Sequence, residues 1–171
     1  MDREQLRARQ APLKQRYGDD PGSARTTISA RASFSEPGIT CTVDTWAGPT
    51  RAGLHTATGG DGSDACSADM LLQALIGCMG VTLRSVATAM RLELRSAHLS
   101  ATGEFDARGT LGLSREAPVG ATGIVVTAVL DTDATDQQLA RLGELTERYC
   151  VVGQTLQPRP TLTVLRAGTG T

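Results

Sequence analysis

Four cysteines are the residues of this sequence best suited to covalent chemistry, because a thiolate is both a nucleophile and a metal ligand. They are Cys41, Cys66, Cys78 and Cys150. No two have the CxxC spacing, and the two histidines, His55 and His98, stand alone, so the sequence predicts no zinc site. The first residues have no signal-peptide core, which makes a cytoplasmic protein with reduced thiols the expectation. Any functional disulfide would then be transient and catalytic.

Cys78 lies in the middle of an apolar stretch, residues 67–90, which we predict to be one long helix. The apolar positions recur at helical spacing: Leu71, Leu75, Cys78, Met79, Val86 and Met90. Ser67 is the expected N-cap, and Asp69 suits the positive end of the helix dipole. Because the apolar surface covers most of the circumference, the helix should be buried. Polar residues interrupt the run too often for a membrane span.

Cys150 follows a second predicted helix. Thr135 and Gln138 have the spacing of a capping box, and the helix that they open should end near Cys150, with Gly153 as its stop. From spacing alone, two buried cysteines are more often packing residues than a redox pair.

The remaining pattern predicts strands. Residues 25–46 read as a hairpin with Cys41 pointing inward, and residues 47–65 as a loop that leads into the long helix. Further strands are expected at 92–105, where His98 faces solvent, and at 123–130 and 161–165. Strands outnumber helices without alternating with them. The prediction is therefore an α+β fold with a mainly antiparallel sheet around the long helix.

Length and composition limit the organisation and the partners. The chain of 171 residues fits one domain, which we place at residues 25–171, after an N-terminal helical arm and linker at residues 1–24. That arm is either a loose surface element or a segment that docks on a partner subunit. A net charge of −1 gives no footprint for nucleic-acid binding. Only 3% of the residues are aromatic, and such a thin core favours an obligate oligomer.

Two motifs resemble the OsmC/Ohr family (osmotically inducible protein C and organic hydroperoxide resistance proteins), in its OsmC-like branch. The first is HTATGGDGSDACSADMLLQALIGCMGVTLRSVA at residues 55–87, and the second is LTERYCVVGQTL at residues 145–156. The segment Phe105-Asp106-x-Arg108-Gly109 is also similar to that branch. The resemblance covers residues 25–166.

The resemblance implies an intertwined homodimer in which two long helices pack together inside two sheets, with sites at the subunit interface. It implies a thiol-dependent peroxidase that reduces organic hydroperoxides in oxidative or osmotic stress defence. In this sequence Cys78 would be the peroxidatic cysteine and Cys150 the resolving one, with an external dithiol as reductant and no cofactor. A thiolate attacks the peroxide, the resulting sulfenic acid condenses with a second thiol, and a dithiol reopens the disulfide.

The supporting residues are less well defined by the resemblance. Cys78 is expected in mid-helix, out of reach of its own helix N-terminus, so we expect a cation to stabilise its thiolate. Arg51 is the first choice and Arg31 the second. Ala68 stands where peroxidases of the family have a glutamate, and its neighbour Asp69 either replaces that carboxylate or only favours the helix start. Cys66, near the helix start, leaves open a Cys66–Cys150 exchange.

Two other functions remain open from the sequence. In a non-catalytic module, both cysteines would line an apolar cleft that binds a small apolar ligand at the dimer interface. In a cysteine hydrolase, Cys78 would work with His55 or His98, although His98 has the wrong strand parity and His55 lies in a loop.

Overall fold

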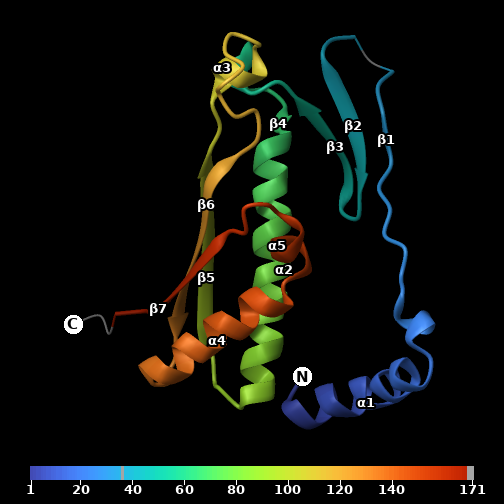
Figure 1. Cartoon of the computed structure of the whole chain (residues 1–171), viewed down its shortest axis with the longest axis vertical. Coiled ribbons are helices and arrows are strands. Elements are labelled where there is room, and N and C mark those ends of the chain that lie inside the picture. The colour runs from blue at the N-terminus through green and yellow to red at the C-terminus, as the bar shows by residue number, and fades with distance from the viewer. Residues whose placement is uncertain (36, 169–171) are drawn as a thin grey trace.

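The computed structural model describes residues 1–35 and 37–168, and one helix, α2 (Ser67–Met90), connects its two halves. Figure 1 shows α2 running the length of the molecule, with one sheet on each side and a helical arm at its lower end. This arrangement confirms the predicted α+β class.

The N-terminal half is a helical arm followed by a four-stranded sheet. The arm is α1 (Arg3–Asp19) and the short 3₁₀ helix η1 (Pro21–Ala24). The sheet has the order β1-β2-β3-β4, with antiparallel pairs except for parallel β3 and β4. Its strands are β1 (Ala32–Ser33), β2 (Thr40–Thr45), β3 (Gly48–Gly53) and β4 (Ala65–Cys66), with the 3₁₀ helix η2 (Thr56–Thr58) between the last two.

The C-terminal half is a three-stranded sheet with two helices against α2. The sheet has the order β5-β6-β7, and its strands are β5 (Ser96–Glu104), β6 (Thr122–Asp131) and β7 (Thr161–Arg166). Strands β5 and β6 are antiparallel, whereas β6 and β7 are parallel. Helix α4 (Asp136–Tyr149) and helix α5 (Val151–Thr155) separate β6 from β7, and α3 (Ala107–Thr110) lies in the loop after β5. Both sheets are therefore mixed rather than purely antiparallel.

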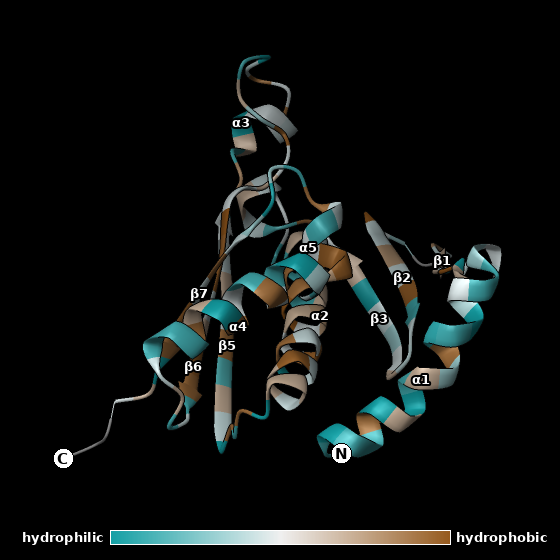
Figure 2. Ribbon diagram, turned by 60° about the horizontal axis from the view of Figure 1, so that its bottom comes forward, coloured by the Kyte–Doolittle hydropathy of each residue, from teal (hydrophilic) through white to brown (hydrophobic). Residues whose placement is uncertain are grey.

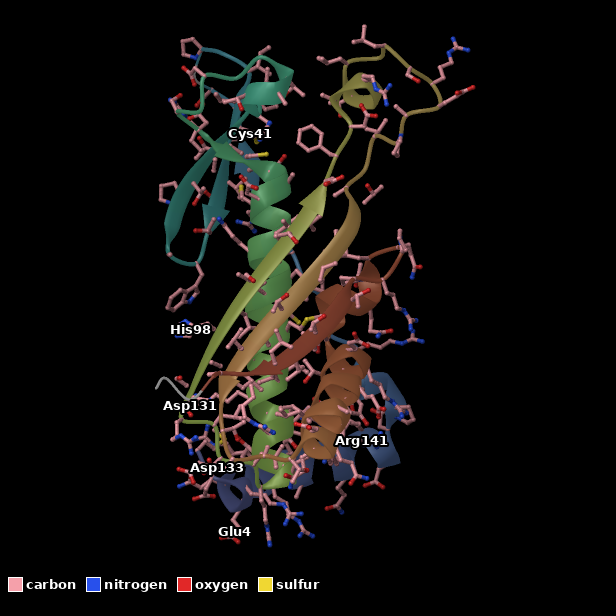
Figure 3. All side chains as sticks on the ribbon, turned by 90° about the vertical axis from the view of Figure 1, so that its left-hand side faces the viewer. Glu4, Cys41, His98, Asp131, Asp133 and Arg141 are labelled. Atoms are coloured by element: carbon pink, nitrogen blue, oxygen red, sulfur yellow. The ribbon has the colours of Figure 1, made fainter. Side chains whose placement is uncertain are left out.

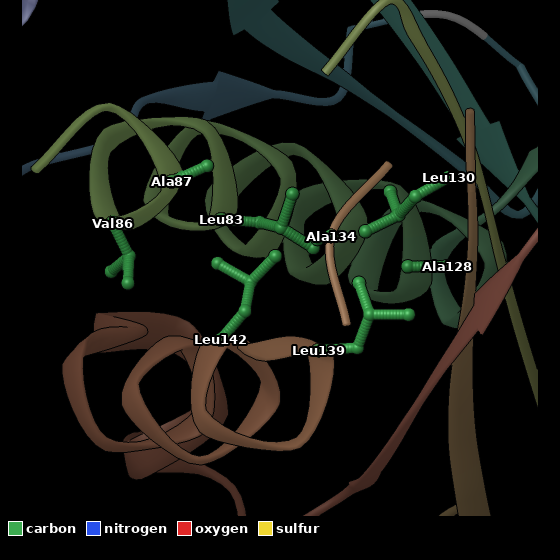
Figure 4. Packing of buried hydrophobic residues seen from close by; sticks show 8 residues of the cluster. All are labelled: Leu83, Val86, Ala87, Ala128, Leu130, Ala134, Leu139 and Leu142. Atoms are coloured by element: carbon green, nitrogen blue, oxygen red, sulfur yellow. The ribbon is translucent and has the colours of Figure 1, made fainter. Parts of the chain in front are cut away.

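The core lies where α2, α4 and the inner face of β6 meet. Figure 4 shows Leu83 of α2, Leu130 of β6 and Leu142 of α4 converging there, and all three are almost completely buried. Helix α4 has the amphipathic pattern that this position requires, and its N-terminus carries the predicted capping box of Thr135 and Gln138. The core thus forms on one side of α2 only.

Within the single chain α2 is buried on one side only, and burial of its other side against a second subunit stays a prediction. Its buried residues are Leu75, Met79, Leu83, Val86 and Ala87. The opposite side is open: Gly77 is exposed, and Val81 is 75% exposed. Although α2 is long and apolar enough to cross a membrane, its buried side packs against α4 and β5. Figure 2 shows that apolar residues also lie on α1 and β2 of the N-terminal half.

Several predicted boundaries differ from the structure. Residues 47–65 are not a loop throughout, because β3 pairs with β2 along its whole length. Residue Cys66, rather than Ser67, is the N-cap of α2, and its side chain makes no capping bond. Gly153 does not stop a helix but lies inside α5, since α4 already ends at Tyr149. Helix α1 continues through Pro12 without interruption.

Candidate functional site

The fold brings Cys78 and Cys150 together. Cys78 lies in the middle of α2, and Cys150 is the single residue that connects α4 to α5. The two thiols are in hydrogen-bonding contact, within an apolar cluster that includes Leu75, Met79 and Val126. Cys150 is completely buried, whereas Cys78 is half-buried at the edge between the core side and the open side of α2. The pair therefore has one sulfur near the surface and one enclosed.

The junction of α4 and α5 fixes the position of Cys150. Its backbone N–H donates to the carbonyl of Thr146 at 3.0 Å and so closes the last turn of α4. Its Sγ accepts a hydrogen bond from the N–H of Gly153 at 3.3 Å and thereby caps α5. Cys150 is thus held by the end of one helix and the start of the next.

The surroundings of Cys78 favour its thiolate. Burial opposes ionisation, but hydrogen bonds from the N–H of Val152, the thiol of Cys150 and the N–H of Val151 outweigh it and lower the pKa of Cys78. Thr82 adds a smaller contribution, and its hydroxyl also donates to the carbonyl of Cys78 at 2.8 Å. Backbone N–H groups at the start of α5 thus stabilise the thiolate, which the sequence did not predict, while the expected contribution of a cation stays a prediction.

The surroundings of Cys150 have the opposite effect. Burial raises the pKa of its thiol, and the neighbouring Cys78 raises it further, while the N–H of Gly153 partly compensates. Cys78 is therefore the more acidic thiol of the pair, and Cys150 is the thiol that holds its proton more tightly. This difference matches the roles that the resemblance implies, with attack by Cys78 and resolution by Cys150.

Arg51 lies at the other end of the site region. It projects from β3 and forms an ion pair with Asp64, which is only 14% exposed. Asp64, just before β4, is thus the carboxylate that holds Arg51, while Asp69 is exposed in the first turn of α2. Arg31 is exposed, and its carbonyl accepts the N–H of Asp44. Since the start of α2 and Cys78 are about 16 Å apart at the usual helix rise, the roles of Arg51 and Asp69 at the thiolate stay predictions.

The other two cysteines are remote from the pair. Cys66 precedes Cys78 by twelve residues, which is about 18 Å along a helix. Because Cys150 is in contact with Cys78, Cys66 of the same chain is too far from Cys150 for the ~7 Å Cα separation of a disulfide. Cys41 is paired with Ala52 in β2 and β3 and is half-exposed rather than fully enclosed. The Cys66–Cys150 exchange is therefore excluded in this conformation.

Neither histidine is placed to assist Cys78. His55 caps η2 through Nδ1, which accepts the N–H of Ala57 at 3.0 Å, and its ring meets the edge of Phe105. His98 projects outward from β5, as predicted, and Figure 3 shows it on the outer side of the sheet. Among residues 1–35 and 37–168, no three side chains of the metal-binding types come close enough to hold a metal ion.

Two cavities lie near the cysteine pair. One, of about 500 Å³, is largely apolar and includes Leu71, Ile124, Leu156 and Pro158 in its wall. Leu71 is two helical turns before Cys78 on the same side of α2. The other, of about 270 Å³, reaches Met79 and Gly153 beside Cys150 and is otherwise polar.

The sequence did not reveal the groups that stabilise Cys78. The donors are backbone N–H groups, so the side chains of Val151 and Val152 carry no sign of them. The available signal was the position of Cys150, directly after one helix and before a short apolar run that forms another turn. In the loop before α2, Gly60 is required because the backbone packs closely there: an added Cβ would lie 1.8 Å from the carbonyl oxygen of Leu54.

Comparison with known proteins identifies the family. Two solved structures have the same fold: an OsmC-like protein from Mycoplasma pneumoniae (TM-score 0.68, 14% identity, covering 84% of this chain and 99% of that one) and an organic hydroperoxide resistance protein from Elizabethkingia anophelis (0.66, 12%, 85% and 99%). The organic hydroperoxide resistance protein OhrB of Bacillus subtilis is also similar, with a TM-score of 0.54 and 15% identity over 82% of this chain and 98% of that one. No curated protein matches the sequence. The sequence model of the OsmC-like protein family matches residues 60–165, and the chain therefore belongs to that family.

Proposed function

We propose that this protein is a thiol-dependent peroxidase that reduces organic hydroperoxides with Cys78 as the peroxidatic and Cys150 as the resolving cysteine. The observation that carries the proposal is the contact between two thiols of opposite electrostatic surroundings. The organic hydroperoxide resistance proteins among the structural neighbours support the same chemistry.

The first half-reaction consumes the hydroperoxide. The Cys78 thiolate attacks the terminal oxygen of the hydroperoxide, the O–O bond breaks, and the alkoxide leaves and takes up a proton as the alcohol. Cys78 is then a sulfenic acid. The sulfur of Cys150 attacks it, a disulfide forms, and the hydroxyl leaves as water with the proton of Cys150. The peroxide has been reduced by two electrons, and both cysteines have been oxidised.

The second half-reaction restores the thiols. An external dithiol reduces the disulfide by two successive exchanges and leaves as its own disulfide. A reducing compartment such as the cytoplasm supplies such a reductant without any bound cofactor. The apolar cavity beside Leu71 and Ile124 suits the hydrocarbon part of an organic substrate.

The direct test is consumption of an alkyl hydroperoxide by the purified protein with a dithiol. Wild type should turn over, and Cys78→Ser should lose essentially all activity because a hydroxyl does not replace the thiolate. Cys41→Ser, a cysteine outside the pair, is the matched control and should retain the wild-type rate. Equal rates for wild type and Cys78→Ser would refute the proposal.

Arg51 and Asp69 enter the proposal as supporting residues. Asp64 orients the guanidinium of Arg51, as expected of a cation that assists a thiolate or a bound peroxide. We assign this role to Arg51 acting in the assembled protein, with Asp69 favouring the start of α2. Arg51→Ala should slow the first half-reaction more than Arg31→Ala does, and equal effects would remove Arg51 from the site.

A homodimer is part of the same proposal. The open side of α2 carries the small residues Ala74 and Gly77 beside the exposed Val81, which permits close packing of a second helix. The N-terminal sheet likewise exposes Phe34, Ile39 and Trp46. Exposed apolar surface on this scale is typical of a subunit interface.

A second candidate function is the binding of a small apolar ligand without catalysis. The apolar cavity of about 500 Å³ favours it, because a cavity of this size can enclose much of a small molecule. Native mass spectrometry of the purified protein would show a retained ligand, whereas a clean apo spectrum would count against this function.

A further inference from the structure

A polar cavity lies beside Cys150 and shares Arg159 with the apolar cavity. It is lined by Met79, Glu144, Glu147, Arg148, Gly153, Gln154, Arg159 and Pro160. Met79, Gly153 and Pro160 of this wall are buried. A Cβ added to Gly153 would lie 3.4 Å from Sγ of Cys150 and 3.5 Å from Cε of Met79. Only the width of a methyl group therefore separates this cavity from the resolving sulfur.

Two carboxylates and two guanidinium groups line the cavity, and both carboxylates already accept hydrogen bonds from elsewhere in the chain. Glu144 is paired with Arg141 at 2.8 Å, and a carboxylate oxygen of Glu147 accepts the N–H of Leu162 at 2.7 Å. Arg148 lies over the ring of its neighbour Tyr149, 5.6 Å from the centroid, and Arg159 is exposed at the rim. Guanidinium groups bind carboxylates and other oxyanions in preference to neutral groups.

We propose that this cavity admits the reductant, an anionic dithiol whose thiolate attacks Sγ of Cys150, while the hydroperoxide reaches Cys78 from the neighbouring apolar cavity. This inference rests on the proposed peroxidase function and adds a second entrance to it. The apolar cavity would receive the substrate and the polar cavity the reductant.

The chemistry favours attack at Cys150. When the reductant thiolate bonds to Sγ of Cys150, the disulfide breaks and Cys78 leaves as a thiolate with the electron pair. The thiol of lower pKa is the better leaving group, and the N–H groups of Val151 and Val152 stabilise that thiolate. The second thiol of the reductant, as its thiolate, then attacks the reductant sulfur bound to Cys150. Cys150 is released and takes a proton, and the reductant leaves as a cyclic disulfide.

The attacked sulfur can be identified directly. The Cys78–Cys150 disulfide is formed with diamide, so that the test does not depend on hydroperoxide activity. The oxidised protein is exposed to mercaptoethanesulfonate together with a maleimide that traps the released thiolate, and the cysteine peptides are mapped by mass spectrometry. The inference expects the small thiol on Cys150 and the maleimide on Cys78. The reverse pattern, or failure of diamide to link the two cysteines, would overturn it.

The role of the arginines is tested by charge preference. Rates of disulfide opening are compared for mercaptoethanesulfonate and for neutral mercaptoethanol, in wild type, Arg148→Ala, Arg159→Ala and the double variant. The ratio of the two rates should fall about tenfold in the double variant, since charge-assisted hydrogen bonds are lost. Arg115→Ala, in the exposed loop after α3, is the matched control. An unchanged ratio in the double variant would refute the anionic reductant. Failure of an organic hydroperoxide to oxidise the cysteines of the wild-type protein would refute only the peroxidase function.

Discussion

At the scale of single residues, the site depends on how three backbone N–H groups are shared between two sulfurs. The N–H of Val151 serves Cys78, that of Gly153 serves Cys150, and that of Val152 contributes to both, more strongly to Cys78. Two chemically identical side chains thereby acquire different proton affinities. The asymmetry comes from the start of α5, which is only five residues long, and not from any charged side chain near the pair.

The pH dependence of the first half-reaction follows from this asymmetry. Because the pKa of Cys78 is lowered, the rate should rise with pH and reach half of its maximum below the ~8.5 of an ordinary thiol. Cys150→Ala removes a donor to the thiolate, so it should raise the pKa of Cys78 and move the curve to higher pH. Ultraviolet absorbance of the thiolate, measured against Cys78→Ser as blank, reports the pKa of Cys78 in wild type and in Cys150→Ala. An unshifted curve in Cys150→Ala would contradict the hydrogen bond between the thiols.

Gly153 separates the two half-reactions. Its replacement by alanine keeps the N–H that caps α5 but places a methyl group against Sγ of Cys150 and Met79. Gly153→Ala should therefore slow reduction of the disulfide several-fold and leave oxidation by hydroperoxide nearly unchanged. Stopped-flow measurement of each half-reaction checks this, and Gly18→Ala in α1, where an added Cβ meets no atom within 4 Å, is the control in the same protein.

At the scale of elements, α4 positions Cys150 at its C-terminal end. Thr135, its N-cap, and Thr146, inside it, should have opposite effects on the stability of the protein. Thr135 accepts the N–H of Gln138 and caps the helix, whereas the hydroxyl of Thr146 is buried without a hydrogen-bond partner among the described residues. Thr135→Val should lower the free energy of unfolding by about 1 kcal/mol. Thr146→Val should raise it by a similar amount, because an orphan hydroxyl costs about 1–3 kcal/mol. Urea unfolding measures both, and destabilisation by Thr146→Val would contradict the orphan assignment.

The elements also show what a sequence can predict. Helices with strong apolar spacing or capping boxes, as at Thr135, and the strand at 123–130 were predicted close to their observed bounds. Strand β3 was not, because Gly48, Pro49 and Gly53 are poor strand formers and it forms only by pairing with β2. The contact of Cys78 with Cys150 came from the family resemblance, since no local pattern encodes which two segments meet in space. The donors of Val151 and Val152 are backbone groups, so their only sequence signal was the place of Cys150 between a helix and a short apolar run.

At the scale of the whole molecule, the open side of α2 and the N-terminal sheet leave the single chain incomplete. Val81→Glu would place a charge on the face where we expect the partner helix. This variant should sediment as a monomer, because burying an unpaired charge costs several kcal/mol. Val119→Glu, at a similarly exposed position in the loop before β6, should keep the wild-type mass. A monomeric wild type would contradict the assembly.

The turn between β2 and β3 has a practical consequence for following that assembly. Trp46, at the tip of this turn, is the only tryptophan of the chain and is fully exposed in the single subunit. Its fluorescence emission in water should be red-shifted, and coverage by a second subunit should move it to shorter wavelength. Dilution of the native protein would then report subunit dissociation optically, with no added label and no second tryptophan to obscure the signal.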